Sequence, residues 1–354
     1  MQSAEGVDGS EDSESERRAW RTWGPYLSMR QWGTVREDYS ADGNAWDYLP
    51  FEAAHRRAYR WGEDGLLGIC DDQQRLCLAL ALWNGHDEIL KERFFGLSNQ
   101  QGNHGEDVKE YWHYLDALAD SSYLRAVYRY PIDAYPYQQL RERNAVPGPE
   151  VKLLDLGVFE HDRYFDIEVE FAKRGPSEVV ARITATNRSG EAAELHLLPH
   201  FWFRNTWSWM APRPDAPSLR ALGNGLAIEH PDLANYRIEV GGDFRWLFCD
   251  NETDNEALFN CPGHSAHPKG AIGDAVLSGD DSLCNQEGTG SKAAAHFRLQ
   301  LRPGESQVVR WLLADTGGIS LAQVDEVCDQ RRQDADRFYE TVSPAPTDPE
   351  AALI

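Results

Sequence analysis

Aromatic residues and paired carboxylates recur together in the first third of the chain. They occur in the runs QWGTVREDYS at 31–40, YRWGEDG at 59–65 and GNHGED at 102–107. An aromatic face can stack on a ring-shaped ligand, and carboxylates around it accept hydrogen bonds from hydroxyl groups. Because Asp and Glu are rarely buried unless paired, an ordinary apolar core does not account for this mixture. Residues 20–112 therefore predict a site for a polar ligand with many hydroxyls, and a sugar is the first candidate.

Two kinds of role are open to these side chains. Hydrolysis of a glycoside requires two carboxylates that flank the bond, one protonated and one ionised. The low-ranked candidates for that chemistry are Glu37, Asp38, Glu63, Asp64, Glu106 and Asp107. In so acidic a chain such clusters also arise by chance, so binding, capping or ion pairing is the favoured role. The residues predicted to contact the ligand are Trp32, Arg36, Glu37, Asp38, Tyr39, Trp46, Trp61, Glu63, Asp64, His104, Glu106 and Trp207.

Other chemistries find little support in the sequence. Cys261, His264 and His267 lie close together, but a fourth metal ligand at a recognised spacing is missing. The run GTGSK at 288–292 lacks the glycine spacing of a phosphate-binding loop and precedes a predicted strand. No nucleophile elbow of the GxSxG type is present. The sequence predicts neither a metal nor a cofactor.

Net charge and composition limit the classes of binding partner and the cellular locations that the sequence predicts. The 354 residues carry a net charge of −23, which disfavours binding to nucleic acid or to an anionic membrane. No apolar run reaches the ~18 residues of a membrane span, and the N-terminus is acidic and polar, unlike a signal peptide. The six cysteines form no CxxC pair, which fits reduced thiols. A cytoplasmic location is predicted.

Hydrophobic periodicity predicts the elements that position these residues. Alternation or apolar runs predict strands over 76–82, 111–115, 165–171, 179–186, 194–203, 236–240 and 244–248. The Pro303-Gly304 turn between 296–301 and 308–313 predicts a hairpin. Short helices are predicted over 51–59, 120–130 and 136–144, and an amphipathic helix over 320–342. The fold class is mainly β, a large antiparallel sandwich with short helical insertions.

The chain divides into three parts by composition. Residues 1–16 contain six acidic and no basic residues, so a disordered tail is predicted. Residues 17–318 form the sandwich domain. Residues 319–354 contain the predicted helix and a Pro-rich end, which indicates a linker.

Long motifs point to a known family. The runs at 20–28, 31–40, 57–65, 76–85, 102–111 and 202–209 resemble the N-terminal portion of bacterial proteins similar to mannosyl-oligosaccharide glucosidases, glycoside hydrolase family 63. The likeness extends from about 16 to 340. It implies a sandwich domain that precedes an (α/α) six-hairpin barrel, and an inverting mechanism whose Asp acid and Glu base are carried by the barrel.

The resemblance assigns this chain a supporting role. The chain ends where the barrel would begin, so no catalytic residue is expected in it. We expect an N-terminal sandwich domain of an α-glucosidase-like hydrolase of carbohydrate metabolism, with an oligosaccharide or glucoside as ligand and the barrel as partner, in cis or in trans. The loops 31–47, 61–72 and 102–107 would face the barrel and shape a sugar subsite or the domain contact. The alternative is a free-standing, non-catalytic carbohydrate-binding or assembly module; an autonomous hydrolase is the least favoured hypothesis.

Overall fold

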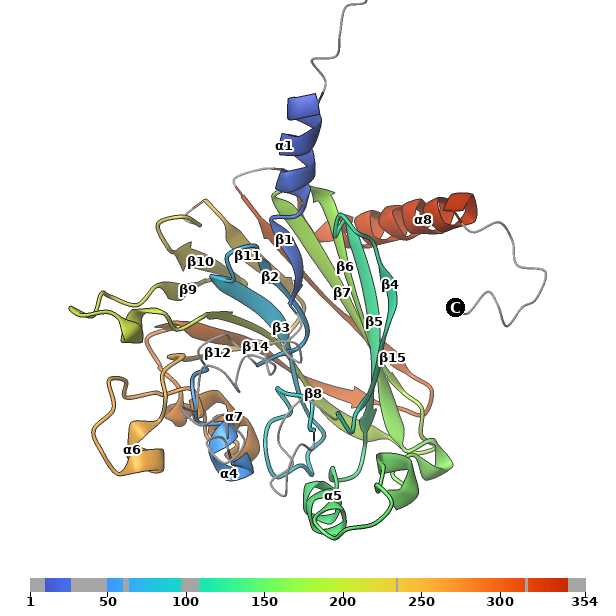
Figure 1. Cartoon of the computed structure of the whole chain (residues 1–354), viewed down its shortest axis with the longest axis vertical. Helices are drawn as coiled ribbons and strands as arrows, with labels where there is room; N and C mark the ends of the chain where they lie inside the picture. Colours follow the sequence, from blue (N-terminus) through green and yellow to red (C-terminus); the bar gives the residue numbers. More distant parts are fainter. Residues whose placement is uncertain are drawn as a thin grey trace, which may run out of the picture.

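Two antiparallel β-sheets form the framework of the described part of the molecule (Figure 1). The structure, a computed structural model, describes residues 10–26, 50–59, 64–96, 108–233, 235–315 and 318–342. The first sheet has six strands in the order β1 (Trp23–Tyr26), β2 (Leu66–Asp71), β3 (Leu76–Trp83), β8 (Ala193–Phe203), β14 (Lys292–Leu301) and β12 (Arg245–Cys249). The second has nine strands in the order β13 (Thr289–Gly290), β9 (Ser218–Leu222), β10 (Gly225–Glu229), β11 (Arg237–Gly241), β15 (Ser306–Ala314), β7 (Glu178–Asn187), β6 (Tyr164–Gly175), β5 (Tyr123–Pro131) and β4 (Tyr111–Ala117). The predicted mainly β sandwich is confirmed.

The core lies between the two sheets. On β3, Leu76, Leu78, Leu80 and Leu82 face this core, while the small residues between them face outwards. On β6, Phe165, Ile167 and Val169 face the same core from the other sheet. Period two on both strands follows from the alternation of side chains along a pleated strand. The alternation seen in the sequence thus gives the correct inward face for both strands.

Helices cover the outer face of each sheet. The helices are α1 (Ser10–Trp20), α4 (Phe51–Ala54), α5 (Tyr137–Asn144), α6 (Asn255–Phe259), α7 (Ala271–Ser278) and α8 (Val324–Val342). Ile272 and Val276 of α7 pack on Ala81, Leu198 and Leu247 of the six-stranded sheet. The long helix α8 lies across the nine-stranded sheet (Figure 1).

The helix predicted as a linker is part of the folded unit. Val324, Cys328 and Ala335 of α8 are buried against Val180 and Leu312 of the nine-stranded sheet. Ion pairs surround this contact, with Arg182 2.9 Å from Asp329 and Arg310 2.8 Å from Asp325. An amphipathic stripe gains free energy only when it is covered, and the outer face of this sheet covers it.

Two predicted elements are wrong. The segments 296–301 and 308–313 do not form a hairpin, because β14 pairs with β8 and β12 whereas β15 pairs with β7 and β11. The chain crosses from one sheet to the other at the turn, which a local turn signal cannot reveal. The predicted helix at 120–130 is strand β5, paired with β4 and β6. Its buried Leu124, Ala126 and Tyr128 alternate with more exposed residues, and this period of two decides for a strand.

Part of the segment predicted as disordered is helical. Helix α1 begins at Ser10 and ends at Trp20, with Arg17 and Arg18 in its last turn. Basic residues there complement the negative end of the helix dipole. The prediction of disorder for the remaining residues, 1–9, lies outside the described part of the chain.

Candidate functional site

Most of the predicted ligand-binding residues lie outside the described part of the chain. These are Trp32, Arg36, Glu37, Asp38, Tyr39, Trp46, Trp61, Glu63, His104 and Glu106, together with the candidate acid or base Asp107. Asp64 and Trp207 are described. The roles of the other residues stay predictions. The described residues that flank them in the sequence show which parts of the fold hold the ends of these segments.

Asp64 belongs to a buried ion cluster. Its two oxygens lie 2.5 Å from Arg93 Nη1 and 2.5 Å from Lys269 Nζ. Glu92 Oε2 lies 2.7 Å from Lys292 Nζ, and all five side chains are buried. We call Asp64, Glu92, Arg93, Lys269 and Lys292 the ion cluster.

Burial and charge oppose each other inside the ion cluster. Burial lowers the pKa of Lys269 to about 8, although Asp64 opposes the shift. Burial also favours the uncharged form of Glu92, but the surrounding cations outweigh it and hold the pKa of Glu92 well below its usual range. His200, 3.9 Å from Glu92, stays neutral because burial lowers its pKa to about 3. Buried charges are costly unless they are paired, and every charged side chain of this cluster has a partner of opposite charge within it.

The described ends of the three predicted ligand-binding segments meet on residues 90–96. The Gly65 N–H, just after 60–63, donates to the Glu92 carbonyl at 2.6 Å. Gly96 forms a β-bridge with Val108, which closes 97–107, and the Lys109 N–H donates to the Phe95 carbonyl at 2.9 Å.

The third segment, 27–49, is followed by Phe51, whose ring centroid lies 5.9 Å from that of Phe95. Glu110 also holds residues 90–96 in place, because it accepts hydrogen bonds from Lys91 Nζ at 2.7 Å and from the Tyr128 hydroxyl at 2.6 Å. The sequence reasoning left 88–98 without an assignment, so it missed this support. Its charge pattern, Lys91-Glu92-Arg93 inside an apolar neighbourhood, is the signal that could have found it.

Trp207 is held inside the molecule. Its side chain is 3% exposed, and its ring N–H donates to Glu252, which also pairs with Arg213. Trp209, two residues later in the same turn, is 48% exposed. The structure therefore presents the ring of Trp209 at the surface, and the predicted sugar contact of Trp207 stays a prediction.

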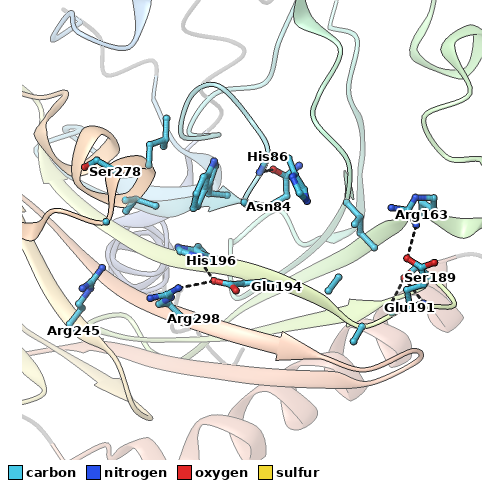
Figure 2. Close-up of a pocket in the computed structure, with 18 residues that line it drawn as sticks. Asn84, His86, Arg163, Ser189, Glu191, Glu194, His196, Arg245, Ser278 and Arg298 are labelled. Atoms are coloured by element: carbon cyan, nitrogen blue, oxygen red, sulfur yellow. Dashed lines mark hydrogen bonds and ion pairs between the residues drawn. The ribbon is translucent and has the colours of Figure 1, made fainter.

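A pocket of about 590 Å³ lies on the outer face of the six-stranded sheet (Figure 2). A row of side chains from neighbouring strands crosses this face: Trp83 of β3 pairs in register with His196 of β8, and His196 with Arg298 of β14. Arg245 of β12 pairs with His296 of β14. The end of α7 at Leu277 and Ser278 forms one wall.

Hydrogen bonds along this row run in one direction. A carboxylate can only accept, so His196 Nε2–H donates to Glu194 at 2.8 Å. His196 Nδ1 must then accept from His296 Nε2–H at 2.7 Å, and His296 Nδ1 accepts from Arg245 Nε–H at 3.1 Å. Burial keeps both rings neutral: it lowers the pKa of His196 and takes that of His296 to about 3. Arg298 also donates to Glu194, at 3.1 Å (Figure 2).

Sequence reasoning took Glu194 and His196 only as part of a strand. Three polar residues, Glu194, His196 and His200, at alternating positions of a largely apolar strand were the available signal. Among the described residues, no group of three or more His, Cys, Asp or Glu side chains is arranged to hold a metal ion. Within the same part of the chain, no helix is long and apolar enough to cross a membrane.

Comparison with known proteins yields one curated relative. An uncharacterized protein of Saccharomyces cerevisiae is 38% identical over an alignment of length 387, which covers 95% of this chain and 36% of the yeast protein. The chain thus spans about a third of the length of this relative. No family model matches the chain.

Solved structures give weaker likenesses. A polysaccharide lyase is 12% identical over 72% of this chain and 27% of its own, with a TM-score of 0.30. A putative kojibiose phosphorylase from the human microbiome is 9% identical over 77% and 30%, with a TM-score of 0.29. A galactose mutarotase-like protein from Lactobacillus casei is 8% identical over 72% and 95%, with a TM-score of 0.29. At such scores the description of the fold rests on the sheet topology of this chain itself.

Proposed function

We propose that this chain is the sandwich portion of a larger, α-glucosidase-like glycoside hydrolase, and that one end of the sandwich shapes a sugar subsite or docks on the catalytic barrel. The observation that carries the proposal is the meeting of three segment ends on residues 90–96. The segments 27–49, 60–63 and 97–107 hold the Trp and carboxylate residues predicted to bind a sugar. The described residues at the ends of all three segments contact residues 90–96.

A structural role, and not proton transfer, suits the one described carboxylate of this group. Both oxygens of Asp64 are engaged by cations, Arg93 and Lys269. A general acid or base must be free to exchange a proton with a substrate. Asp64 instead fixes the described end of the segment that contains Trp61 and Glu63.

The length of the yeast relative agrees with a larger protein. Roughly two thirds of that relative lies outside the aligned part. A catalytic barrel in that remainder, in the cytoplasm, would supply the acid and the base that the family resemblance assigns to it. The ligand proposed for the complete protein is an oligosaccharide or a glucoside with an α-linked glucose.

Calorimetric titration of the chain with methyl α-glucoside and maltotriose tests the proposed subsite. Trp61→Ala and Trp32→Ala should each weaken binding about tenfold, which corresponds to about 1.4 kcal/mol. Tyr339→Ala is the matched control, because this aromatic side chain is 42% exposed on α8, against the other sheet. The control should bind as the unchanged chain does. Equal affinity in all variants, or binding of neither glucoside, would overturn the sugar subsite.

A further inference from the structure

We propose that the pocket on the outer face of the six-stranded sheet is a second binding site, and that it takes an uncharged pyranose. Helix α7 separates it from the ion cluster. His196, Leu198 and His200 are successive outward residues of β8: His196 lines the pocket, Leu198 packs against α7, and His200 adjoins the ion cluster. Neither the argument for this site nor its test depends on the function proposed above.

The pocket has the size and the aromatic face that a sugar ring needs. Its volume of about 590 Å³ falls within the range of small-molecule sites. Trp83 lines it and is fixed in two ways. The indole N–H donates to the Asp87 carbonyl at 2.9 Å, and the ring meets that of His196 edge-on, with centroids 4.8 Å apart. A ring held in place loses little freedom when a ligand stacks on it.

The polar groups of the pocket are oriented before any ligand arrives. The hydrogen-bond chain from Arg245 through His296 and His196 to Glu194 fixes the tautomer of both imidazoles. Arg298 is anchored on Glu194 by one nitrogen, and its side chain is 63% exposed, so further N–H groups are free to donate to a ligand. Glu194 is 35% exposed; its Oε1 accepts from His196 and Arg298 and its Oε2 from Gln300, which leaves one acceptor position on Oε2 for a ligand. Adjacent fixed donors and acceptors match the vicinal hydroxyls of a sugar.

The charge balance favours an uncharged ligand over an anion. Every arginine that lines the pocket is paired: Arg298 with Glu194, Arg245 with Asp281, and Arg163 with both Asp133 and Glu191. Three guanidinium groups thus face four carboxylates, and with neutral histidines the local charge is not positive. Figure 2 shows Arg163 beside Glu191 at one end of the pocket and Arg245 at the other. A phosphate or carboxylate would have to displace these partners, whereas hydroxyl groups can add to them.

Calorimetry or saturation-transfer NMR of the full chain with the methyl glycosides of glucose, galactose and mannose tests the site. Trp83→Ala should weaken binding of the preferred glycoside about tenfold. Because Trp83 is partly buried, Arg298→Gln serves as the second variant: the residue is exposed, so the fold tolerates the change, and binding should weaken about threefold. Arg302→Gln, an exposed arginine just after the same strand, and Trp209→Ala, an exposed tryptophan elsewhere, should leave binding unchanged.

Three results would overturn the proposal. One is that none of the glycosides binds at millimolar concentration. Another is that inorganic phosphate binds the pocket and is displaced by none of the glycosides. The last is that glycoside binding survives both Trp83→Ala and Arg298→Gln; if it were then lost in Trp61→Ala, the loop subsite would stand and this pocket would not.

Discussion

At the scale of single residues, the charged side chains buried in the sandwich have the clearest consequences for stability. Glu92 is almost inaccessible and compensates Lys292 at 2.7 Å, with Arg93 and Lys269 close by. A buried pair of this kind adds little net stability, but removing one partner leaves an uncompensated charge. The ion cluster therefore tolerates loss of a member poorly, whatever its net contribution.

Glu92→Gln should lower the free energy of unfolding by about 3–5 kcal/mol. The matched control is Glu229→Gln, which breaks the exposed pair with Arg220 and should cost less than about 1 kcal/mol. Urea unfolding followed by circular dichroism measures both. Equal midpoints for the two variants would show that the cluster is solvated in solution and is no rigid support.

Histidines whose pKa is lowered by burial give the fold a defined response to acid. Burial lowers the pKa of His55 to about 4 and those of His200 and His296 to about 3. Above pH ~6.5 all three are neutral in both states and do not alter stability. Below it the unfolded chain takes up protons that the folded chain does not, so each histidine removes about 1.4 kcal/mol per pH unit until its folded pKa is reached.

Urea unfolding at several pH values between about 7 and 5 isolates this effect, because the carboxylates titrate lower. His200→Gln should reduce the pH dependence by about a fifth to a third, since it removes one of five histidines whose pKa burial lowers, two of them by smaller shifts. His264→Gln, at an exposed position, should leave it unchanged. A stability that does not change over this range would mean that the three rings are accessible to protons in the folded state.

At the scale of elements, the sequence predicted strands well and their partners poorly. The alternation in β6 and β7 is a local property, and both strands are found where predicted. Whether β14 pairs with β15 depends on which sheet each strand joins, and β8 and β12, the partners of β14, are distant in the sequence. The candidate ligand-binding residues within 20–112 were predicted from composition, but the ion pair between Asp64 and Lys269 joins residues about two hundred positions apart, which composition cannot reveal.

Helix α8 offers a test at this scale, because the helix predicted as a linker packs on the nine-stranded sheet. Val324 is fully buried against the nine-stranded sheet, whereas Phe338 on the same helix is 52% exposed. Val324→Ala should lower the free energy of unfolding by about 1–2.5 kcal/mol, because it removes two buried methyl groups and leaves a cavity. Phe338→Ala removes more atoms but should cost less than about 0.5 kcal/mol. Were α8 a mere linker, thermal unfolding would show no difference between the two variants.

At the scale of the whole molecule, the last prediction follows from the proposed division of roles between the sandwich and a catalytic barrel. The chain alone should not release nitrophenol from an aryl α-glucoside, because the family resemblance places the acid and the base in a barrel and Asp64 is committed to ion pairs. Roughly two thirds of the yeast relative lies outside the part aligned with this chain. The full-length yeast protein should hydrolyse the same glucoside with inversion at the anomeric carbon.

Proton NMR of the first-formed sugar distinguishes inversion from retention. Hydrolysis by the chain itself, abolished by Glu37→Gln or Glu106→Gln, would contradict this division and make the sandwich an enzyme in its own right. If the yeast relative were also inactive while the chain still bound glucosides, the glucosidase proposal would fall and a carbohydrate-binding or assembly module would remain. The ion cluster would have the same structural role in a glucosidase and in a binding module. The stability of Glu92→Gln therefore cannot distinguish these two proposals, and the activity assay is required.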